Sequence, residues 1–286
     1  MGKVFLDYDQ AALDRAYDQP AWAPNMQQVL ARRALASEAA RRRLGGPRTF
    51  AYGATPIETL DLYPTTRSNA PIAVFLHGGA WRGGHARDAA YAAETLVHAG
   101  AHCVVPEFAT VMEVGLDGMA LQVRRAVAWV AKNAPTFGGD PGRLHVIGHS
   151  SGGHLAATVL VTDWNDFGLG ADVVSGGVCI SGMFDLYPVR LSARSAYVRF
   201  DDRIESDLSP LRHLARLRCP VIVAYGDQES PEFQRQSSEL ARALESRGRL
   251  DRLIVGLGYN HFELPETLAS PYGLLGRAVL EQMKLA

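Results

Sequence analysis

A serine set between two glycines is the clearest chemical signal in the sequence. Residues 148–152 read Gly-His-Ser-Ser-Gly, between an apolar run at residues 144–147 and a helical pattern at residues 151–161. A Gly-x-Ser-x-Gly turn that joins a strand to a helix holds a serine hydroxyl where it can attack a carbonyl carbon. A glycine-rich turn without chemistry is the alternative for a bare match, but the strand–turn–helix context favours catalysis. The sequence therefore predicts Ser150 as the nucleophile and excludes Ser151, which has no glycine two residues before it.

A second glycine-rich turn offers backbone N–H groups for the oxyanion of such a reaction. Residues 77–81 read His-Gly-Gly-Ala-Trp and directly follow an apolar, strand-like run. Lipases and esterases place a turn of this type beside the nucleophile, and its N–H groups face the oxygen that becomes negative. We expect the donors to be the N–H groups of Gly79 and Ala80, joined by that of Ser151. Trp81 is either an ordinary core residue or a substrate-binding wall of the acyl pocket.

The remaining members of a catalytic triad are expected in the order serine, acid, histidine. His261 lies in a loop after the last strand candidate, and two carboxylates, Asp227 and Glu229, follow the strand candidate at residues 221–225. The acid of this loop usually stands three residues beyond the glycine that ends the strand, and three residues beyond Gly226 is Glu229. An aspartate directly after that glycine more naturally caps the turn through a local hydrogen bond. The sequence favours Glu229 as the acid, with Asp227 as the alternative.

The other chemically active side chains indicate neither a metal site nor a cofactor site. The other histidines are scattered or lack carboxylate or cysteine partners, and no glycine-rich phosphate loop is followed by lysine. Cys103, Cys179 and Cys219 are far apart and lie in or beside apolar stretches, which is typical of buried, reduced thiols. The predicted reaction needs no metal and no cofactor, because a triad and an oxyanion turn supply the nucleophile, the base and the stabilising dipoles.

Alternating strand and helix patterns provide the frame for these residues. From about residue 57, short apolar runs alternate with helical patterns, which is typical of a mainly parallel sheet covered by helices on both faces. Residues 1–45 have helical character, and residues 183–215 break the rhythm without a clear strand. We expect a single α/β-hydrolase domain over residues 1–286, with residues 1–45 as an N-terminal helical segment and residues 183–215 as a small helical cap at the mouth of the site.

The composition limits the classes of partner. The net charge of the 286 residues is −1, so no global field favours nucleic acid or an anionic membrane. No apolar run approaches a membrane span of about 20 residues, and the N-terminus turns acidic where a signal peptide needs an apolar core. We expect a cytoplasmic protein that acts on a small-molecule aromatic amide or ester and binds neither nucleic acid nor membrane. The oligomeric state stays open, with a homodimer among the choices.

Several stretches of the chain resemble kynurenine formamidases of the α/β-hydrolase superfamily. Besides the two glycine-rich motifs, the resemblance rests on SGMFDLYP at residues 181–188, ESPEFQRQS at residues 229–237 and GYNHFE at residues 258–263. The glycine-rich motifs are shared with the broader hormone-sensitive-lipase-like esterases, whereas SPEFQRQS is more specific to the formamidases. Two positions depart from the family pattern, because the family commonly has tyrosine where this chain has Ala80 and aspartate where it has Glu229.

The resemblance implies hydrolysis of the formyl amide of an aromatic amine, as in the conversion of N-formylkynurenine to kynurenine and formate in tryptophan breakdown. His261 would take the proton of Ser150, and an acyl-enzyme would form and then react with water. The alternatives are a carboxylesterase for small acyl esters and an amide or carbamate hydrolase for another aromatic compound. A binding protein on a degenerate hydrolase fold would lack a triad member, and none is missing. Ala80 leaves more room near the acyl group, so the sequence leaves the natural substrate open.

Overall fold

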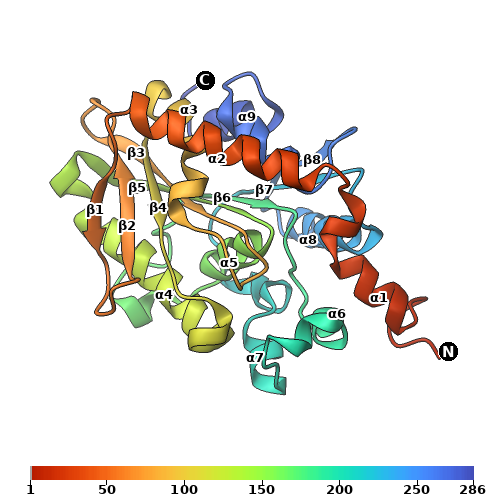
Figure 1. Cartoon of the computed structure of the whole chain (residues 1–286). Coiled ribbons are helices and arrows are strands. Elements are labelled where there is room, and N and C mark those ends of the chain that lie inside the picture. The colour runs from red at the N-terminus through yellow and green to blue at the C-terminus, as the bar shows by residue number, and fades with distance from the viewer. Residues whose placement is uncertain (1) are drawn as a thin grey trace.

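The computed structural model describes residues 2–286, which form an eight-stranded sheet with helices packed around it (Figure 1). The strand order is β1-β2-β4-β3-β5-β6-β7-β8. The strands are β1 (Arg48–Ala51), β2 (Thr59–Tyr63), β3 (Ala70–Leu76), β4 (His102–Pro106), β5 (Gly139–His149), β6 (Gly176–Ile180), β7 (Val221–Gly226) and β8 (Leu250–Gly256). The α-helices are α1 (Gln10–Tyr17), α2 (Met26–Arg43), α3 (Ala93–Ala99), α4 (Val111–Asn133), α5 (Ser151–Leu160), α6 (Tyr187–Leu191), α7 (Asp202–Asp207), α8 (Pro231–Glu245) and α9 (Leu274–Gln282). The 3-10 helices are η1 (Gln19–Trp22), η2 (Ala86–Ala92), η3 (Ala134–Phe137), η4 (Trp164–Phe167), η5 (Ala193–Ala196), η6 (Pro210–Arg216) and η7 (Leu264–Ala269).

The sheet is parallel except at one edge. Strands β4, β3, β5, β6, β7 and β8 pair parallel in that order, whereas β1 and β2 are antiparallel additions beside β4. This confirms the predicted α/β-hydrolase architecture with a mainly parallel sheet. The sequence did not predict β1, because its four residues are mostly exposed and show no apolar run or alternation.

Apolar side chains cover both faces of the sheet. Along β3, Ile72, Val74 and Leu76 belong to one buried cluster, and the intervening Ala73 and Phe75 belong to another. Successive side chains of a strand point to opposite faces of its sheet, so a strand buried on both faces reads as a continuous apolar run. The polar residues of the candidate site therefore lie in the loops that follow the carboxyl ends of β3, β5, β6, β7 and β8.

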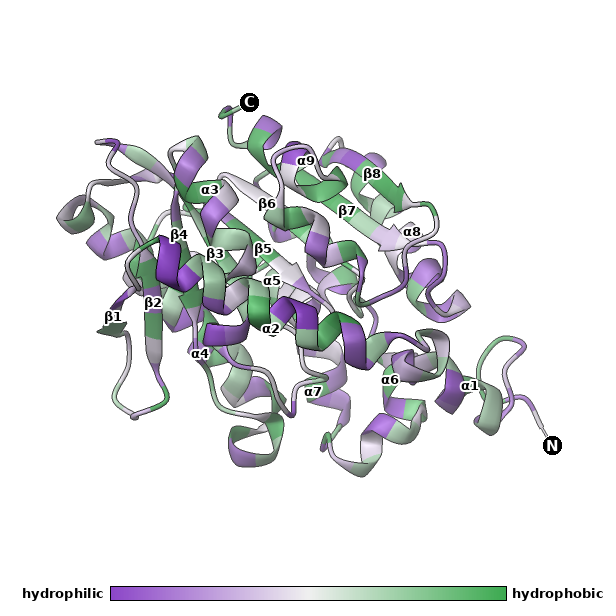
Figure 2. Ribbon diagram, turned by 45° about the horizontal axis from the view of Figure 1, so that its top comes forward, coloured by the Kyte–Doolittle hydropathy of each residue, from purple (hydrophilic) through white to green (hydrophobic). Residues whose placement is uncertain are grey.

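Two helical segments lie outside the regular alternation. The N-terminal segment consists of α1, η1 and α2, and hydrophilic turns alternate with hydrophobic turns along α2 (Figure 2). After β6, the chain forms α6, η5, α7 and η6 before it enters β7. Helix α1 contacts α6 and η5 of this second segment and also α8, while α2 packs against η2. The two segments therefore meet beside the carboxyl end of the sheet. No helix within residues 2–286 is both long and apolar enough to cross a membrane.

Candidate active site

Ser150 stands on a tight turn between β5 and α5. Its backbone has φ 58° and ψ −124°, and such sparsely populated conformations cost a non-glycine residue about 1–3 kcal/mol. A Cβ atom at Gly148 would lie 2.0 Å from the carbonyl oxygen of Gly152, and a Cβ atom at Gly152 would lie 2.2 Å from that of Leu76. Both glycines are therefore required for the close backbone packing that holds the Ser150 hydroxyl at the carboxyl end of the sheet.

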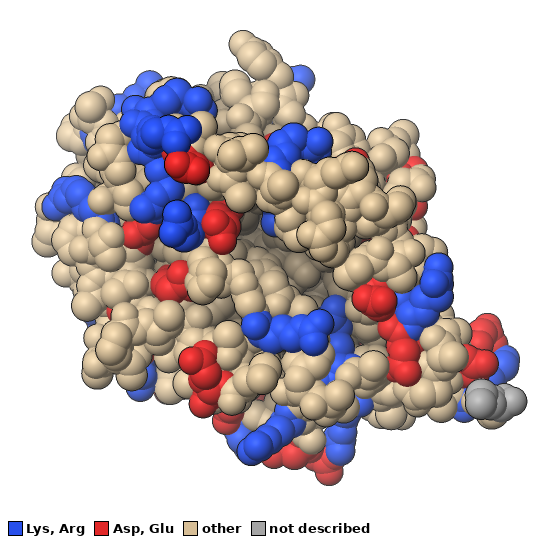
Figure 3. All heavy atoms as spheres, in the orientation of Figure 1, with Lys and Arg blue, Asp and Glu red and all other residues tan. Residues whose placement is uncertain are grey.

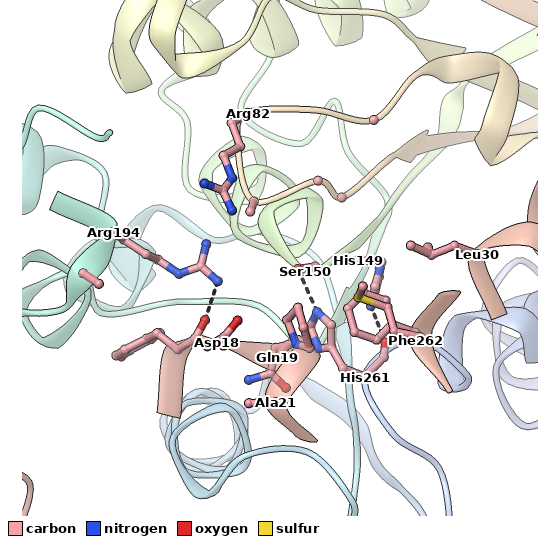
Figure 4. A pocket seen from close by; sticks show the side chains of 18 of the residues that line it. Asp18, Gln19, Ala21, Leu30, Arg82, His149, Ser150, Arg194, His261 and Phe262 are labelled. Carbon is pink, nitrogen blue, oxygen red and sulfur yellow. Dashed lines mark hydrogen bonds between the residues drawn. The ribbon is translucent and has the colours of Figure 1, made fainter. Parts of the chain in front are cut away.

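Ser150, His261 and Glu229 form one hydrogen-bonded chain. The hydroxyl oxygen of Ser150 lies 2.9 Å from Nε2 of His261, and Nδ1 of His261 lies 2.8 Å from Oε2 of Glu229. His261 and Glu229 are each 2% exposed, so water screens their interaction only weakly. Figure 4 shows the imidazole of His261 directed at Ser150. With Nδ1–H donating to the carboxylate, Nε2 is left to accept the serine proton.

Three donors hold the carboxylate of Glu229. His261 donates to Oε2, while Oε1 accepts hydrogen bonds from the backbone N–H of Gly226 at 2.7 Å and from the hydroxyl of Ser181 at 2.6 Å. Ser181 directly follows β6 and Gly226 ends β7, so two neighbouring strands bring these donors together. Sequence reasoning did not single out Ser181 as a site residue, and its position directly after a buried strand was the available signal.

Asp227 lies outside this chain of hydrogen bonds. One oxygen of its carboxylate accepts a hydrogen bond from the backbone N–H of Gly258 at 2.7 Å, and it also accepts one from the amide of Gln228 at 3.2 Å. Asp227 therefore ties the loop after β7 to the loop after β8, which carries His261. Of the two carboxylates considered from the sequence, the structure places Glu229 within hydrogen-bond distance of the histidine.

The turn after β3 presents backbone N–H groups beside Ser150. Gly79 has φ 137° and Ala80 has φ 56°, and a Cβ atom at Gly79 would lie 1.8 Å from the carbonyl oxygen of Gly83. Among the backbone amides of residues 2–286, those of Gly79, Ala80 and Ser151 donate no hydrogen bond to the protein. Gly79 and Ala80 line the same cleft as Ser150. This arrangement can stabilise negative charge on the oxygen of a carbonyl group that Ser150 attacks.

Trp81 is buried behind the turn and does not line the cleft. Its Nε1–H donates to Nδ1 of His154 at 3.3 Å, and the two rings meet edge to face. Burial lowers the pKa of His154 to about 4, so the ring is neutral and its Nε2–H donates to the carbonyl oxygen of Leu208. Of the two roles considered for Trp81, the structure favours that of a core residue over that of a substrate-binding wall, because its indole N–H finds a buried acceptor and its ring fills the core.

His149, the residue before the serine, supports the loop of the proposed base. Its Nε2 lies 2.8 Å from the backbone carbonyl oxygen of His261, and the centres of the two rings are 4.7 Å apart. Burial, followed by the fields of His261 and Arg33, holds the pKa of His149 well below its usual range. The neutral ring therefore donates Nε2–H to the His261 carbonyl. Nothing in the sequence indicated that His149 is a metal ligand, and the sequence did not predict this contact. The contact joins segments 112 residues apart.

An open cleft of about 930 Å³ leads to Ser150. Its walls come from the N-terminal segment, the turn after β3, the loop after β8 and the chain around η5. Figure 3 shows the hollow near the centre of this face, with basic side chains at its lower edge. The labelled side chains around it include Arg82, Arg194 and Asp18 (Figure 4). Within residues 2–286, no three His, Cys, Asp or Glu side chains are grouped so that they could hold a metal ion.

Comparison with known sequences decides the family. The chain is 31% identical over 239 residues to a kynurenine formamidase of Danio rerio, and the alignment covers 81% of this chain and 80% of the relative. The chain belongs to the kynurenine formamidase family. A second match, to the family model BD-FAE, covers residues 60–175. That range contains both Ser150 and the glycine-rich turn after β3. These two parts of the candidate site therefore lie in the region that matches the BD-FAE model.

Solved structures place this kynurenine formamidase family member among α/β-hydrolase enzymes. A putative thioesterase from Silicibacter sp. tm1040 superposes with a TM-score of 0.81 at 26% identity, covering 92% of this chain and 97% of that chain. The esterase LipW of Mycobacterium marinum superposes with a TM-score of 0.73 at 18% identity, covering 94% of this chain and 90% of that chain, and so shares the fold. Because the chain belongs to this family and has this fold, it is a hydrolase that acts on acyl amides or esters.

Proposed function

We propose that the chain is a serine hydrolase that removes the formyl group from an aromatic amine, with N-formylkynurenine or a close analogue as substrate. The observation that carries the proposal is the hydrogen-bonded chain from Ser150 through His261 to Glu229, beside a turn with unpartnered N–H groups. Membership of the kynurenine formamidase family supports the substrate class. The catalytic residues are Ser150, His261 and Glu229, and the oxyanion donors are the N–H groups of Gly79, Ala80 and Ser151.

Acylation begins when the Ser150 oxygen attacks the formyl carbon. Nε2 of His261 takes the serine proton, and the carboxylate of Glu229 stabilises the imidazolium that forms. The formyl oxygen becomes negative and accepts hydrogen bonds from the turn after β3, where the loss of a single donor typically lowers kcat by about 10²–10³. The C–N bond then breaks, and His261 gives its proton to the departing aromatic amine.

Deacylation repeats these steps with water as the nucleophile. A water molecule attacks the formyl carbon of the Ser150 ester, and His261 takes a proton from it. The same N–H groups stabilise the second tetrahedral intermediate. The bond between the formyl carbon and the Ser150 oxygen breaks, the proton returns to the serine, and formate leaves. The reaction consumes one water molecule and yields formate, a proton and the free amine.

A second candidate function is that of a carboxylesterase for small acyl esters. The favouring observation is Ala80, a small residue that lines the cleft beside Ser150. Its methyl group leaves room for an acyl group larger than formyl, and the same triad cleaves esters and amides. An amide or carbamate hydrolase for another aromatic compound would use the same residues. These alternatives differ from the leading proposal in the substrate and not in the chemical steps.

A comparison of substrates tests the proposed function. kcat/KM would be measured for N-formylkynurenine, an acyl anilide and p-nitrophenyl acetate, each divided by the rate of spontaneous hydrolysis, because activated esters react faster even without an enzyme. We expect the formamide to give the highest ratio. A higher ratio for the ester would contradict the formamidase assignment while leaving the serine mechanism in place.

Substitution of the nucleophile tests the mechanism. Ser150→Ala is expected to lower kcat by about 10⁴ or more and to abolish labelling by a fluorophosphonate probe. Ser151→Ala is the matched control, because it removes a neighbouring hydroxyl but keeps the backbone N–H, so labelling should persist. Turnover by Ser150→Ala at the wild-type rate would overturn the serine mechanism.

A further inference from the structure

Arg194 carries a buried positive charge without an ionic partner. Its side chain is 8% exposed, and no carboxylate oxygen of residues 2–286 lies within 4.0 Å of its guanidinium. The guanidinium donates only to neutral oxygens, the hydroxyl of Tyr197 and the backbone carbonyl of Tyr17, each at 2.8 Å, and it lies over the ring of Trp81. Its Nε is buried and has no acceptor. A buried charge is costly unless an opposite charge and hydrogen bonds compensate it, so the site is incomplete as it stands.

Arg82 brings a second guanidinium to the same place. It stands two residues after Ala80, and its guanidinium lies 4.7 Å from the centre of the Tyr197 ring, whose hydroxyl is bonded to Arg194. Arg82 is exposed, lines the cleft and has no ion pair with any residue of the described chain. Figure 4 shows Arg82 and Arg194 extending from different elements toward the space in front of Ser150. Two guanidinium groups that converge on one space suit a planar carboxylate, because each presents parallel N–H donors.

No acidic group of the cleft within residues 2–286 forms an ion pair with Arg82 or Arg194. Asp14 accepts hydrogen bonds from Gln10 and from the backbone N–H of Ala193. Asp18 lies near Arg194 in Figure 4, but its exposed carboxylate has no nitrogen of an arginine within 4.0 Å. Arg33 also lines the cleft without an ion pair to the described residues, and its Nε and Nη1 are buried without an acceptor, but it belongs to α2 and lies over the ring of Tyr91, away from Tyr197 and Arg194. Of the cleft arginines that have no ion pair in the described chain, Arg82 and Arg194 are the two that meet at one residue, Tyr197.

We propose that Arg82 and Arg194 form a subsite for a carboxylate on the amine portion of the substrate. This deepens the proposed function and rests on it, because the amine portion is the part of a formamide that remains after the formyl group is transferred to Ser150. Arg194 is held in place by Tyr17 and Tyr197, so it is oriented before the substrate arrives. Arg82 follows the oxyanion turn directly, so a carboxylate bound there helps to fix the distance between the reacting carbonyl and Ser150.

A pair of substrates that differ in one charge tests the subsite. N-formylkynurenine carries a carboxylate, and its carboxamide has nearly the same shape without the negative charge. We expect the wild-type protein to prefer the carboxylate substrate in kcat/KM by about 10–100-fold, the range expected for charge-assisted hydrogen bonds. Arg82→Gln should reduce this preference in part, and Arg194→Gln should remove most of it. If Arg194→Gln folds poorly, Arg194→Lys takes its place. It keeps the positive charge and should retain part of the preference.

The control variants separate a local subsite from the general field of the cleft. Arg15→Gln and Arg33→Gln each remove a cation from the same cleft and should keep the wild-type preference. A loss of preference in Arg33→Gln that leaves Arg82→Gln unchanged would overturn the assignment. An equal fall in kcat/KM for both substrates in Arg82→Gln and Arg194→Gln would also overturn it, because that result indicates only a structural role.

The two proposals fail in different ways. If the wild-type protein hydrolyses both formamides without a preference, the subsite is wrong and the proposed function stands. If it hydrolyses neither formamide but cleaves p-nitrophenyl acetate, the proposed function is wrong. Inhibition of that ester hydrolysis by kynurenine and by its carboxamide then measures the same preference. Equal inhibition constants would overturn the subsite, and tighter binding of kynurenine that depends on Arg194 would support it.

Discussion

The hydroxyl of Ser181 donates a hydrogen bond of 2.6 Å to Oε1 of Glu229, and the other oxygen of the same carboxylate holds His261. Ser181 does not touch the cleft, so we expect it to act as a positioning residue through the acid. Hydrogen bonds to charged groups contribute about 1.5–3 kcal/mol, so Ser181→Ala should lower kcat by about 10–100-fold with little change in KM.

The control for Ser181 is Ser237 of α8, which is also fully buried but whose hydroxyl has no hydrogen-bond partner. Ser237→Ala should leave kcat unchanged, because no interaction with the acid is lost. Steady-state kinetics with the same formamide would compare the two variants. If Ser181→Ala keeps the wild-type kcat, the other two donors to Glu229 are sufficient to hold its carboxylate in place.

The two carboxylates after β7 should respond differently to removal of their charge. Glu229→Gln keeps the size of the side chain but leaves the imidazolium of His261 without its counter-charge, so kcat should fall by about 10²–10⁴. Asp227→Asn should mainly affect stability, by about 1 kcal/mol, because it weakens the bond to the N–H of Gly258. Kinetics and urea denaturation of both variants would separate the roles. If Asp227→Asn is folded but inactive while Glu229→Gln stays active, the two roles are exchanged and Asp227 is the acid.

The parts of the candidate site that depend on local chain geometry could be proposed from the sequence alone. Ser150 and the turn at residues 77–81 were recognisable because their glycines meet needs of the backbone within a few residues. Glu229 was chosen over Asp227 from its spacing after Gly226 and from the family resemblance, and the structure places it beside His261. In each case the decisive signal lay within a short stretch of sequence.

Contacts between distant segments could not be predicted in this way. Ser181 and Glu229 are 48 residues apart, and His149 and the carbonyl that it supports are 112 residues apart. The sequence could not decide between the two roles of Trp81, because its burial involves a partner 73 residues away, His154, which local sequence does not reveal. Strand β1 was missed for a different reason, since its mostly exposed residues carry no apolar pattern.

Buried neutral histidines should make the protein sensitive to acid. Burial lowers the pKa of His145 and of His154 to about 4, whereas an unfolded histidine has a pKa near 6.5. Between these two values the unfolded chain binds more protons than the folded chain, so the free energy of unfolding falls as the pH falls. Each such histidine contributes a slope of about 1.4 kcal/mol per pH unit in that window.

His145→Gln tests this slope at a position outside the candidate site, in β5. Urea denaturation at several pH values between 7 and 4 should show a slope smaller by about 1.4 kcal/mol per pH unit than in the wild-type protein. His98→Gln, at an exposed position of α3, is the control for the replacement of a histidine by glutamine outside the buried core. Identical slopes in the wild-type protein and in His145→Gln would contradict the assignment of a buried neutral ring.

The contact between His149 and the backbone of His261 should fix the loop that carries His261. His149→Leu keeps the volume of the side chain but removes the donor to the His261 carbonyl, so the base loop should lose a fixed position relative to Ser150. A displacement of this kind lowers the fraction of molecules in the reactive geometry, and we expect kcat to fall by about tenfold or more. His149→Gln should recover part of the loss, because its amide nitrogen can take the place of Nε2. The rate of labelling by a fluorophosphonate probe should fall and recover in parallel, because labelling needs the same Ser150–His261 geometry. If His149→Leu lowers only the melting temperature and leaves the labelling rate unchanged, the contact stabilises the fold without positioning the base.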